Sequence, residues 1–182
     1  MRIGATAAAL LLCGCASVAT TRLPPLANLP LLPPAALGAT RSVQQVLHVA
    51  YGDQGATLSA VLTVTPQNVQ VIGLNAVGLR LFTLDYDGTT LKSERLPGLP
   101  EQIDPARVLA DLELAFWPLT ALQGALHDAG YQVTEPFART RRLERDGKLV
   151  AEVHYAGDPW SGRLWLSNFQ FGYSLAVDST PQ

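Results

Sequence analysis

Three histidines and one loop serine are the side chains whose types could support acid–base or nucleophilic chemistry. His48 and His154 fall on predicted strands and His127 near the end of a predicted helix, and no two have the spacing of metal ligands. Ser161 stands in a loop near His154 and Asp158, but not on the strand-to-helix turn of a G-x-S-x-G nucleophile. The sequence also contains no phosphate-binding loop and no dinucleotide fingerprint. We therefore expect a protein that is not an enzyme and needs no metal or cofactor.

The first residues predict an export signal. Arg2 precedes an apolar run over residues 3–12, which is too short for a permanent membrane-spanning helix and is typical of the core of a signal peptide. We expect residues 1–14 to be removed.

The residues that follow the apolar run resemble the lipobox of bacterial lipoproteins, in which a cysteine is lipidated and becomes the new N-terminus. Small Gly14 precedes Cys15, and Leu12 stands three positions before that cysteine. We expect Cys15 to carry the lipid anchor. Cys13 is the competing site, although it would put bulky Leu12 at the small position, and an ordinary secretory signal with a chance cysteine is the other alternative.

Composition limits the classes of partner. Both cysteines lie before residue 16, so the mature domain has no thiol for a disulfide, a metal site or a nucleophile. The net charge is −2, which gives no basic footprint for nucleic acid. Charged residues make up 15% and hydrophobic residues 48% of the chain, which is a low share of charge for an exported domain. We expect one domain that handles an apolar ligand.

We expect residues 15–40 to form the lipidated N-terminus and a tether. Prolines at positions 24, 25, 30, 33 and 34 oppose helices and sheet ladders and favour an extended polyproline conformation. The leucines between them could lie on the membrane or on the domain. Ala16 follows the anchor, where an Asp would resemble an inner-membrane retention signal. That comparison favours the periplasmic face of the outer membrane.

From residue 41 the pattern predicts an antiparallel sheet interrupted by two helices. Asp104 can cap a helix that begins at Pro105, Pro118 can open a second helix, and Gly130 can end it. Asp87-Gly88 and Asp146-Gly147 are two-residue hairpin signals. The expected class is α+β. We predict strands over residues 42–51, 57–65, 69–72, 79–86, 89–95, 131–134, 140–145, 148–155, 162–168 and 169–177.

A sheet of about 9 to 11 strands tends to curl, and helices on its concave side would leave a space for cargo. The ordinary alternative is that the apolar residues facing this space simply form the core. The predicted cavity residues are Leu58, Leu62, Phe82, Leu84, Phe116, Trp117, Trp165, Phe171 and Tyr173.

Three stretches carry a family resemblance: residues 77–84 (VGLRLFTL), residues 112–118 (LELAFWP), and the pair LSNF and GYSL over residues 166–175. They resemble uncharacterised bacterial lipoproteins related to LolB, which are often encoded beside fatty-acid-synthase-like genes for aryl polyene pigments. The match covers roughly residues 42–180.

The resemblance implies a LolA/LolB-like half-barrel with two or three short helices on its concave side. It also implies cargo from a LolA-like periplasmic carrier. In LolB an exposed leucine on a protruding loop helps to put cargo into the membrane, and Leu74 or Val77 would fill that role here. Valine is smaller than leucine, and the loop is short.

Arg139, Arg141, Arg142 and Arg145, with Lys148, form the densest charge on the chain. They could guard a solvated strand edge against aggregation, or contact anionic lipid headgroups or an acidic carrier.

The function that we predict is non-covalent binding or transfer of a lipid, an acyl or aryl polyene chain, or a lipidated protein, by a monomer anchored at the outer membrane. One alternative is a scaffold lipoprotein with a filled half-barrel. The weakest is a lipid hydrolase or acyltransferase.

Overall fold

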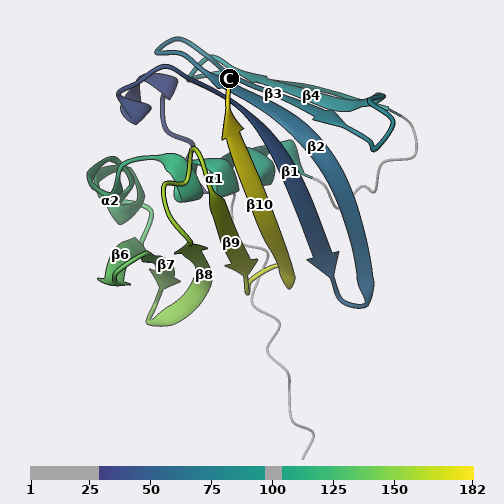
Figure 1. The fold of residues 1–182 in the computed structure, drawn as a ribbon. Helices are drawn as coiled ribbons and strands as arrows, with labels where there is room; N and C mark the ends of the chain where they lie inside the picture. The colour runs from purple at the N-terminus through teal and green to yellow at the C-terminus, as the bar shows by residue number, and fades with distance from the viewer. Residues whose placement is uncertain (1–28, 97–103) are drawn as a thin grey trace, which may run out of the picture.

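One antiparallel sheet makes up most of the protein. The computed structural model describes residues 29–96 and 104–182 (Figure 1). The first half contains the 3-10 helix η1 (Pro34–Leu37) and strands β1 (Arg41–Tyr51), β2 (Gln54–Val64), β3 (Val69–Leu74), β4 (Arg80–Tyr86) and β5 (Leu91–Arg95). The second half contains α1 (Pro105–Phe116), α2 (Leu119–His127), β6 (Tyr131–Phe137), β7 (Thr140–Arg145), β8 (Lys148–Tyr155), β9 (Arg163–Asn168) and β10 (Tyr173–Pro181).

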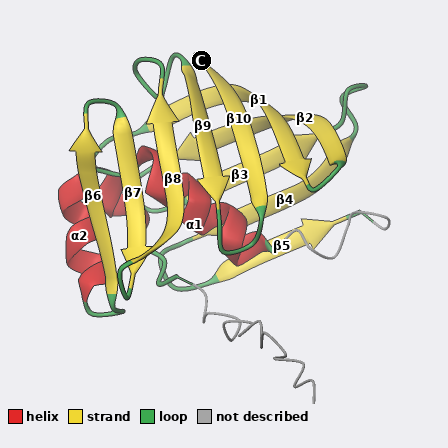
Figure 2. Ribbon diagram, turned by 90° about the horizontal axis from the view of Figure 1, so that it is seen from below, coloured by secondary structure: helices red, strands yellow, loops and turns green. Residues whose placement is uncertain are grey.

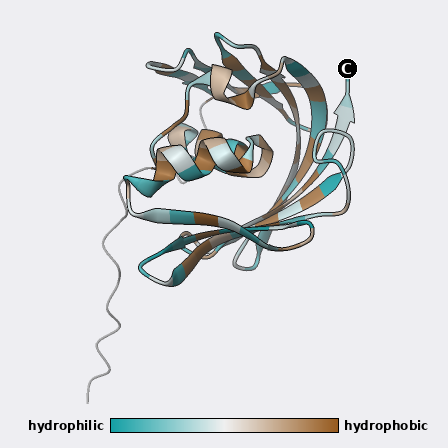
Figure 3. Ribbon diagram, turned by 90° about the vertical axis from the view of Figure 1, so that its left-hand side faces the viewer, coloured by the Kyte–Doolittle hydropathy of each residue, from teal (hydrophilic) through white to brown (hydrophobic). Residues whose placement is uncertain are grey.

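The strand order is β5-β4-β3-β2-β1-β10-β9-β8-β7-β6. Each half is therefore a run of neighbouring antiparallel strands, and the pairing of β1 with β10, in which Leu47 faces Val177, joins the two halves. The sheet curves around α1, which lies inside the curve in Figure 3. Figure 2 shows both α-helices on the same face of the sheet. The predicted α+β class and curved antiparallel sheet of this size, with two short helices on the concave side, are confirmed.

Alternation of apolar residues fixes which side of each strand faces the helices. In β2, Ala60, Leu62 and Val64 are buried, whereas the residues between them are partly exposed. Because side chains alternate across a strand, a shift of one residue would turn this apolar set toward solvent.

The predicted helix boundaries are confirmed. The Asp104 carboxylate accepts a hydrogen bond from the Ala106 amide at 3.0 Å, and Pro105 occupies the first turn, where its missing N–H costs nothing. Pro118 precedes α2, and Gly130 follows that helix with φ of 79°. No helix in the described part of the chain is long and apolar enough to cross a membrane.

The hairpin predictions have mixed outcomes. Asp146-Gly147 forms the predicted two-residue turn, with Arg145 paired to Lys148. The Asp87-Gly88 prediction is wrong, because Tyr86 pairs with Leu91 and leaves a four-residue loop. The Asp87 carboxylate accepts hydrogen bonds from the amides of Thr89 and Thr90 at 2.9 and 2.7 Å, which stabilises the longer loop.

The last predicted strand begins too early. Residues 169–172 form a turn instead, because the Asn168 side chain accepts a hydrogen bond from the Phe171 amide at 3.1 Å and Gly172 adopts a φ of 72°. Strand β10 then starts at Tyr173.

The boundary between tether and domain also differs from the prediction. We call residues 29–37 the strap. Leu32 and Leu37 in the strap are only 2% and 8% exposed, and Leu29 and Leu31 pack against the same core. The proline-rich composition does keep the strap out of the sheet ladder, but the domain rather than the membrane buries its leucines.

Candidate functional site

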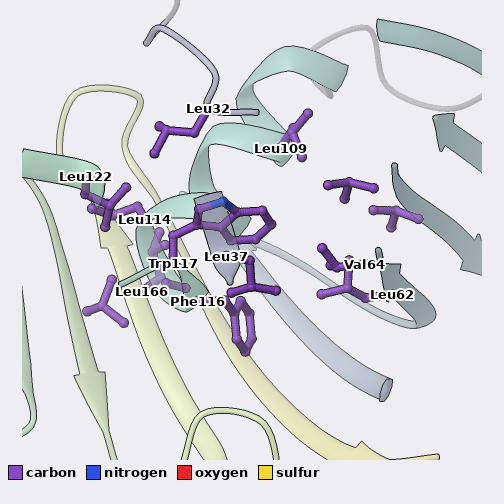
Figure 4. Close-up of a cluster of buried hydrophobic side chains, with 14 of the residues drawn as sticks. Leu32, Leu37, Leu62, Val64, Leu109, Leu114, Phe116, Trp117, Leu122 and Leu166 are labelled. Atoms are coloured by element: carbon purple, nitrogen blue, oxygen red, sulfur yellow. The ribbon is translucent and has the colours of Figure 1, made fainter. Parts of the chain in front are cut away.

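The space between the concave face of the sheet and α1 is where the sequence predicted a cargo cavity. Leu62, Phe82, Leu84, Phe116 and Trp117 all face this interior, and none is more than 8% exposed. They pack against one another and against the strap in one apolar cluster, part of which Figure 4 shows. Leu58 is half-buried at the margin of the cluster. These side chains therefore form packed core in the present conformation.

The prediction for Trp165 is wrong. Its side chain is 43% exposed, whereas Leu164 and Leu166 on either side are each 1% exposed. Because side chains alternate along β9, the two leucines occupy the inner face and Trp165 must lie on the outer face.

Phe171 lies beside the first turn of α1. The Arg107 guanidinium lies 3.7 Å from the centre of the Phe171 ring, a close cation–π contact. The cavity next to it measures about 20 Å³, which is room for about one water molecule. Its lining includes Leu29 of the strap, Ala110 of α1 and Leu143 of β7.

Tyr173 belongs to a polar cluster with Asp111 and Asn168, both of which line the same cavity. Its hydroxyl donates to the Asp111 carboxylate, and the Asn168 amide donates to Asp111 at 3.3 Å and to the Tyr173 oxygen at 3.2 Å. Burial raises the pKa of Asp111 to about 6, although the hydrogen bonds from Tyr173 and Asn168 oppose this shift. Burial and the nearby carboxylate raise the pKa of Tyr173. The cluster fixes the middle of α1 to the sheet.

Glu113 faces the strap from the opposite side of α1. Its Oε2 atom accepts a hydrogen bond from the Leu32 amide at 2.9 Å, and its Oε1 atom has no hydrogen-bond partner among the described residues. Burial raises the pKa of Glu113 to about 8. A carboxyl group of this kind is neutral over much of the physiological range, so it can lie in an apolar interior.

Arg141 holds the last turn of α1. Its Nη1 atom donates to the carbonyl oxygens of Leu114 and Trp117 at 2.8 Å each, and its Nε and Nη2 atoms donate to Glu135 at 3.0 and 2.7 Å. The Tyr155 hydroxyl adds a hydrogen bond to the Ala115 carbonyl at 2.8 Å. These contacts satisfy carbonyl groups that the helix itself leaves unpaired.

The sequence missed this role of Arg141. The strand-edge explanation of the basic run fails, because β7 lies between β6 and β8. Arg141 is 8% exposed, whereas Arg142 points to the other face and pairs with Glu152 at 2.5 Å. Two consecutive arginines on a strand must face opposite ways, and that signal could have identified an inward-facing guanidinium.

Five of the eight exposed large apolar side chains among the described residues lie at one end of the sheet. The β1–β2, β3–β4 and β9–β10 turns and the end of β5 lie at this end, because neighbouring strands alternate in direction. The set, which we call the apolar rim, comprises Tyr51, Val77, Leu79, Leu96 and Phe169, each at least 41% exposed.

Asn75 shapes the β3–β4 turn of the apolar rim. Its Oδ1 atom accepts hydrogen bonds from the amides of Val77 and Leu79 at 3.0 and 2.9 Å. Val77 is 86% exposed, and Leu74 is half-buried at the end of β3. Of the two predicted loop residues, Val77 is therefore the one presented to solvent. Cys15 lies outside the described residues.

The histidines and Ser161 do not form a catalytic arrangement. His154 pairs with Glu152 at 2.6 Å and with the Thr140 hydroxyl at 3.2 Å, and the Ser161 hydroxyl instead donates to Asp158 at 3.4 Å. His48 contacts the Thr57 hydroxyl, and His127 lies in the last turn of α2 as predicted. No group of three or more histidine, cysteine, aspartate or glutamate residues within residues 29–96 and 104–182 could hold a metal ion.

Several solved structures are similar to this chain in their backbone fold. A LolA superfamily protein from Nitrosomonas europaea has a TM-score of 0.45 and 11% identity, covering 78% of this chain and 84% of that one. A DUF1329 family protein from Desulfovibrio piger has a TM-score of 0.38 and 8% identity, covering 81% and 87%. A domain assigned as an outer membrane lipoprotein-sorting protein, from Vibrio parahaemolyticus, has a TM-score of 0.37 and 11% identity, covering 77% and 82%.

No protein of curated function matches the chain. A family model described as "Protein of unknown function (DUF3261)" matches residues 42–181, which span β1 to β10 with both α-helices. The chain belongs to this family.

Proposed function

We propose that the protein is an outer-membrane lipoprotein, lipidated at Cys15, that holds an apolar cargo between its curved sheet and α1. The observation that carries this proposal is how α1 is attached. Within the described residues, α1 makes no backbone hydrogen bond to the sheet and is joined to it by side chains such as Arg141, Tyr155 and Asn168. Movement of the helix away from the sheet would therefore break these side-chain contacts but no strand ladder.

The chemistry of such a carrier is non-covalent. Cargo that entered the interior would replace contacts among leucines and aromatic rings, and its apolar surface would be shielded from water at about 25 cal/mol per Å². This apolar interior would fit a lipid or an acyl or aryl polyene chain. It would also fit the lipid of a lipoprotein delivered by a LolA-like periplasmic carrier. The exposed Val77 on the apolar rim would contact the membrane that receives the cargo.

Native mass spectrometry of the full-length protein, released from membranes in mild detergent, tests the proposal. We expect a bound lipid in addition to the lipid on the anchor cysteine. Trp165→Ala is the matched control, since its side chain lies on the outer face and its removal should leave the bound lipid unchanged. A mass that accounts for the anchor alone would contradict the proposal.

The packed interior favours a second candidate, a scaffold lipoprotein with a filled half-barrel. The cavity beside α1 holds about one water molecule, so cargo requires a conformation that is more open than this one. A protein that never carries a second lipid, yet still assembles with envelope proteins, would support the scaffold.

A further inference from the structure

The strap has the chemical character of an apolar ligand seated in the interior. All nine of its residues are apolar, and three of them are prolines, which have no backbone N–H to desolvate. Leu32 and Leu37 are nearly fully buried, and Leu29 lines the cavity next to Phe171. The strap thus lies along α1 from the cavity to Glu113, and its side chains bring only hydrocarbon into the core.

The strap is attached lightly for so buried a segment. Within the described part of the chain, one hydrogen bond joins it to the rest of the protein, from the Leu32 amide to Glu113, and η1 otherwise bonds only within itself. It pairs with no strand. Its position therefore depends on the burial of a few side chains, which another apolar molecule could replace.

We propose that the trough that residues 29–37 fill between α1 and the sheet is a binding site for an unbranched acyl chain, and that the strap must leave it for the chain to enter. This inference rests on the proposed carrier function. An unbranched chain fits because every side chain of the strap that it replaces is hydrocarbon and brings no charge or polar group into the interior. Because the strap continues toward the predicted anchor at Cys15, its release would also lengthen the connection between domain and membrane.

A disulfide can test this displacement. A Cβ atom at position 88 would lie 3.8 Å from the Pro33 Cβ atom, which is the usual separation in a disulfide. The pair Pro33→Cys and Gly88→Cys would therefore fasten the strap to the β4–β5 loop. Gly88 has a φ of 96°, so Gly88→Cys alone serves as the control for any backbone strain. Cys15 would be acylated, so it would not compete for the new thiols.

The experiment uses the full-length lipoprotein in liposomes with a diazirine analogue of palmitate, photolysed before and after reduction. We expect the reduced double variant to be labelled on α1 like the wild type, and the oxidised form to lose labelling there by about tenfold. Equal labelling of both forms would overturn the strap inference and leave the carrier function standing. Absence of labelling on α1 in the wild type would overturn the carrier function itself.

A second variant keeps the test informative if the disulfide disturbs the fold. Leu32→Ala truncates a strap side chain that is only 2% exposed, and we expect labelling on α1 to rise about threefold because the strap leaves more often. Ala35→Ser changes an exposed position of the same segment and should leave labelling unchanged. Equal labelling of these two variants would contradict the inference.

Discussion

Glu113 joins α1 to the strap and should set how stability depends on pH. Its pKa is about 8 in the folded protein and near 4.5 in the unfolded chain, so its protonated form stabilises the fold. That contribution is complete below pH 4.5 and is lost as the pH rises to about 8. The corresponding loss of stability from Asp111 occurs between pH 3.8 and about pH 6. Glu113 therefore dominates the pH dependence of stability between pH 6 and 8.

We therefore expect the wild type to lose up to about 2 kcal/mol of unfolding free energy between pH 6 and 8. Glu113→Gln keeps an acceptor for the Leu32 amide and should largely remove this loss. Urea unfolding at the two pH values measures the difference. Glu94→Gln, at an exposed position, should behave like the wild type. A Glu113→Gln variant that retained the full loss would show that another group titrates.

At the scale of the elements, the β3–β4 pair depends on a close approach between Gly73 and Phe82. A Cβ atom at position 73 would lie 2.2 Å from the Phe82 ring, so Gly73→Ala must displace the ring or the strand. We expect a loss of about 1–3 kcal/mol in urea unfolding. Gly124→Ala is the matched control on α2, where a Cβ atom meets nothing within 4 Å and helix propensity favours alanine by about 1 kcal/mol. Equal effects of both substitutions would argue against this packing.

A second prediction about how the elements are held together concerns Arg141, because this residue connects β7 to the end of α1. Arg141→Lys keeps the charge, but an ammonium group cannot reach both carbonyl groups and Glu135 with the geometry of a guanidinium. We expect a loss of about 2 kcal/mol and faster amide hydrogen exchange in the last turn of α1. Arg80→Lys, at an exposed position, should change neither. Unchanged exchange in α1 would mean that Arg141 does not hold the helix.

For the whole molecule, the sequence predicted the sheet, the helices and most of their boundaries, because alternation, caps and hairpin residues are local signals. It could not place Trp165, since bulky residues occupied both faces of β9 and only packing decides which face is inside. The strap was missed for a related reason. Its prolines predict an extended backbone, but whether Leu32 and Leu37 are buried depends on α1, about 80 residues further along the chain. The closed interior likewise depends on side chains from distant elements.

Anchoring can be tested separately from cargo. Cys15→Ser should abolish incorporation of radiolabelled palmitate, because the thiol is the acceptor of the lipid. It should also prevent removal of residues 1–14 from the precursor. Cys13→Ser should leave both unchanged if Cys15 is the anchor. Labelling that persists in Cys15→Ser and disappears in Cys13→Ser would reverse the assignment.

The orientation of the domain at the membrane follows from where its exposed apolar residues lie. The apolar rim is at one end of the sheet, and the β4–β5 loop, which carries Thr89, is at the other. We label Val77→Cys, or Thr89→Cys as the matched exposed control, with an environment-sensitive fluorophore in the full-length protein on liposomes. If the apolar rim faces the bilayer, spin-labelled lipid should quench the probe at position 77 and leave the probe at position 89 bright, since quenching requires close contact. Equal quenching at both positions would mean that the lipid anchor alone attaches the domain, and that the apolar rim serves another partner.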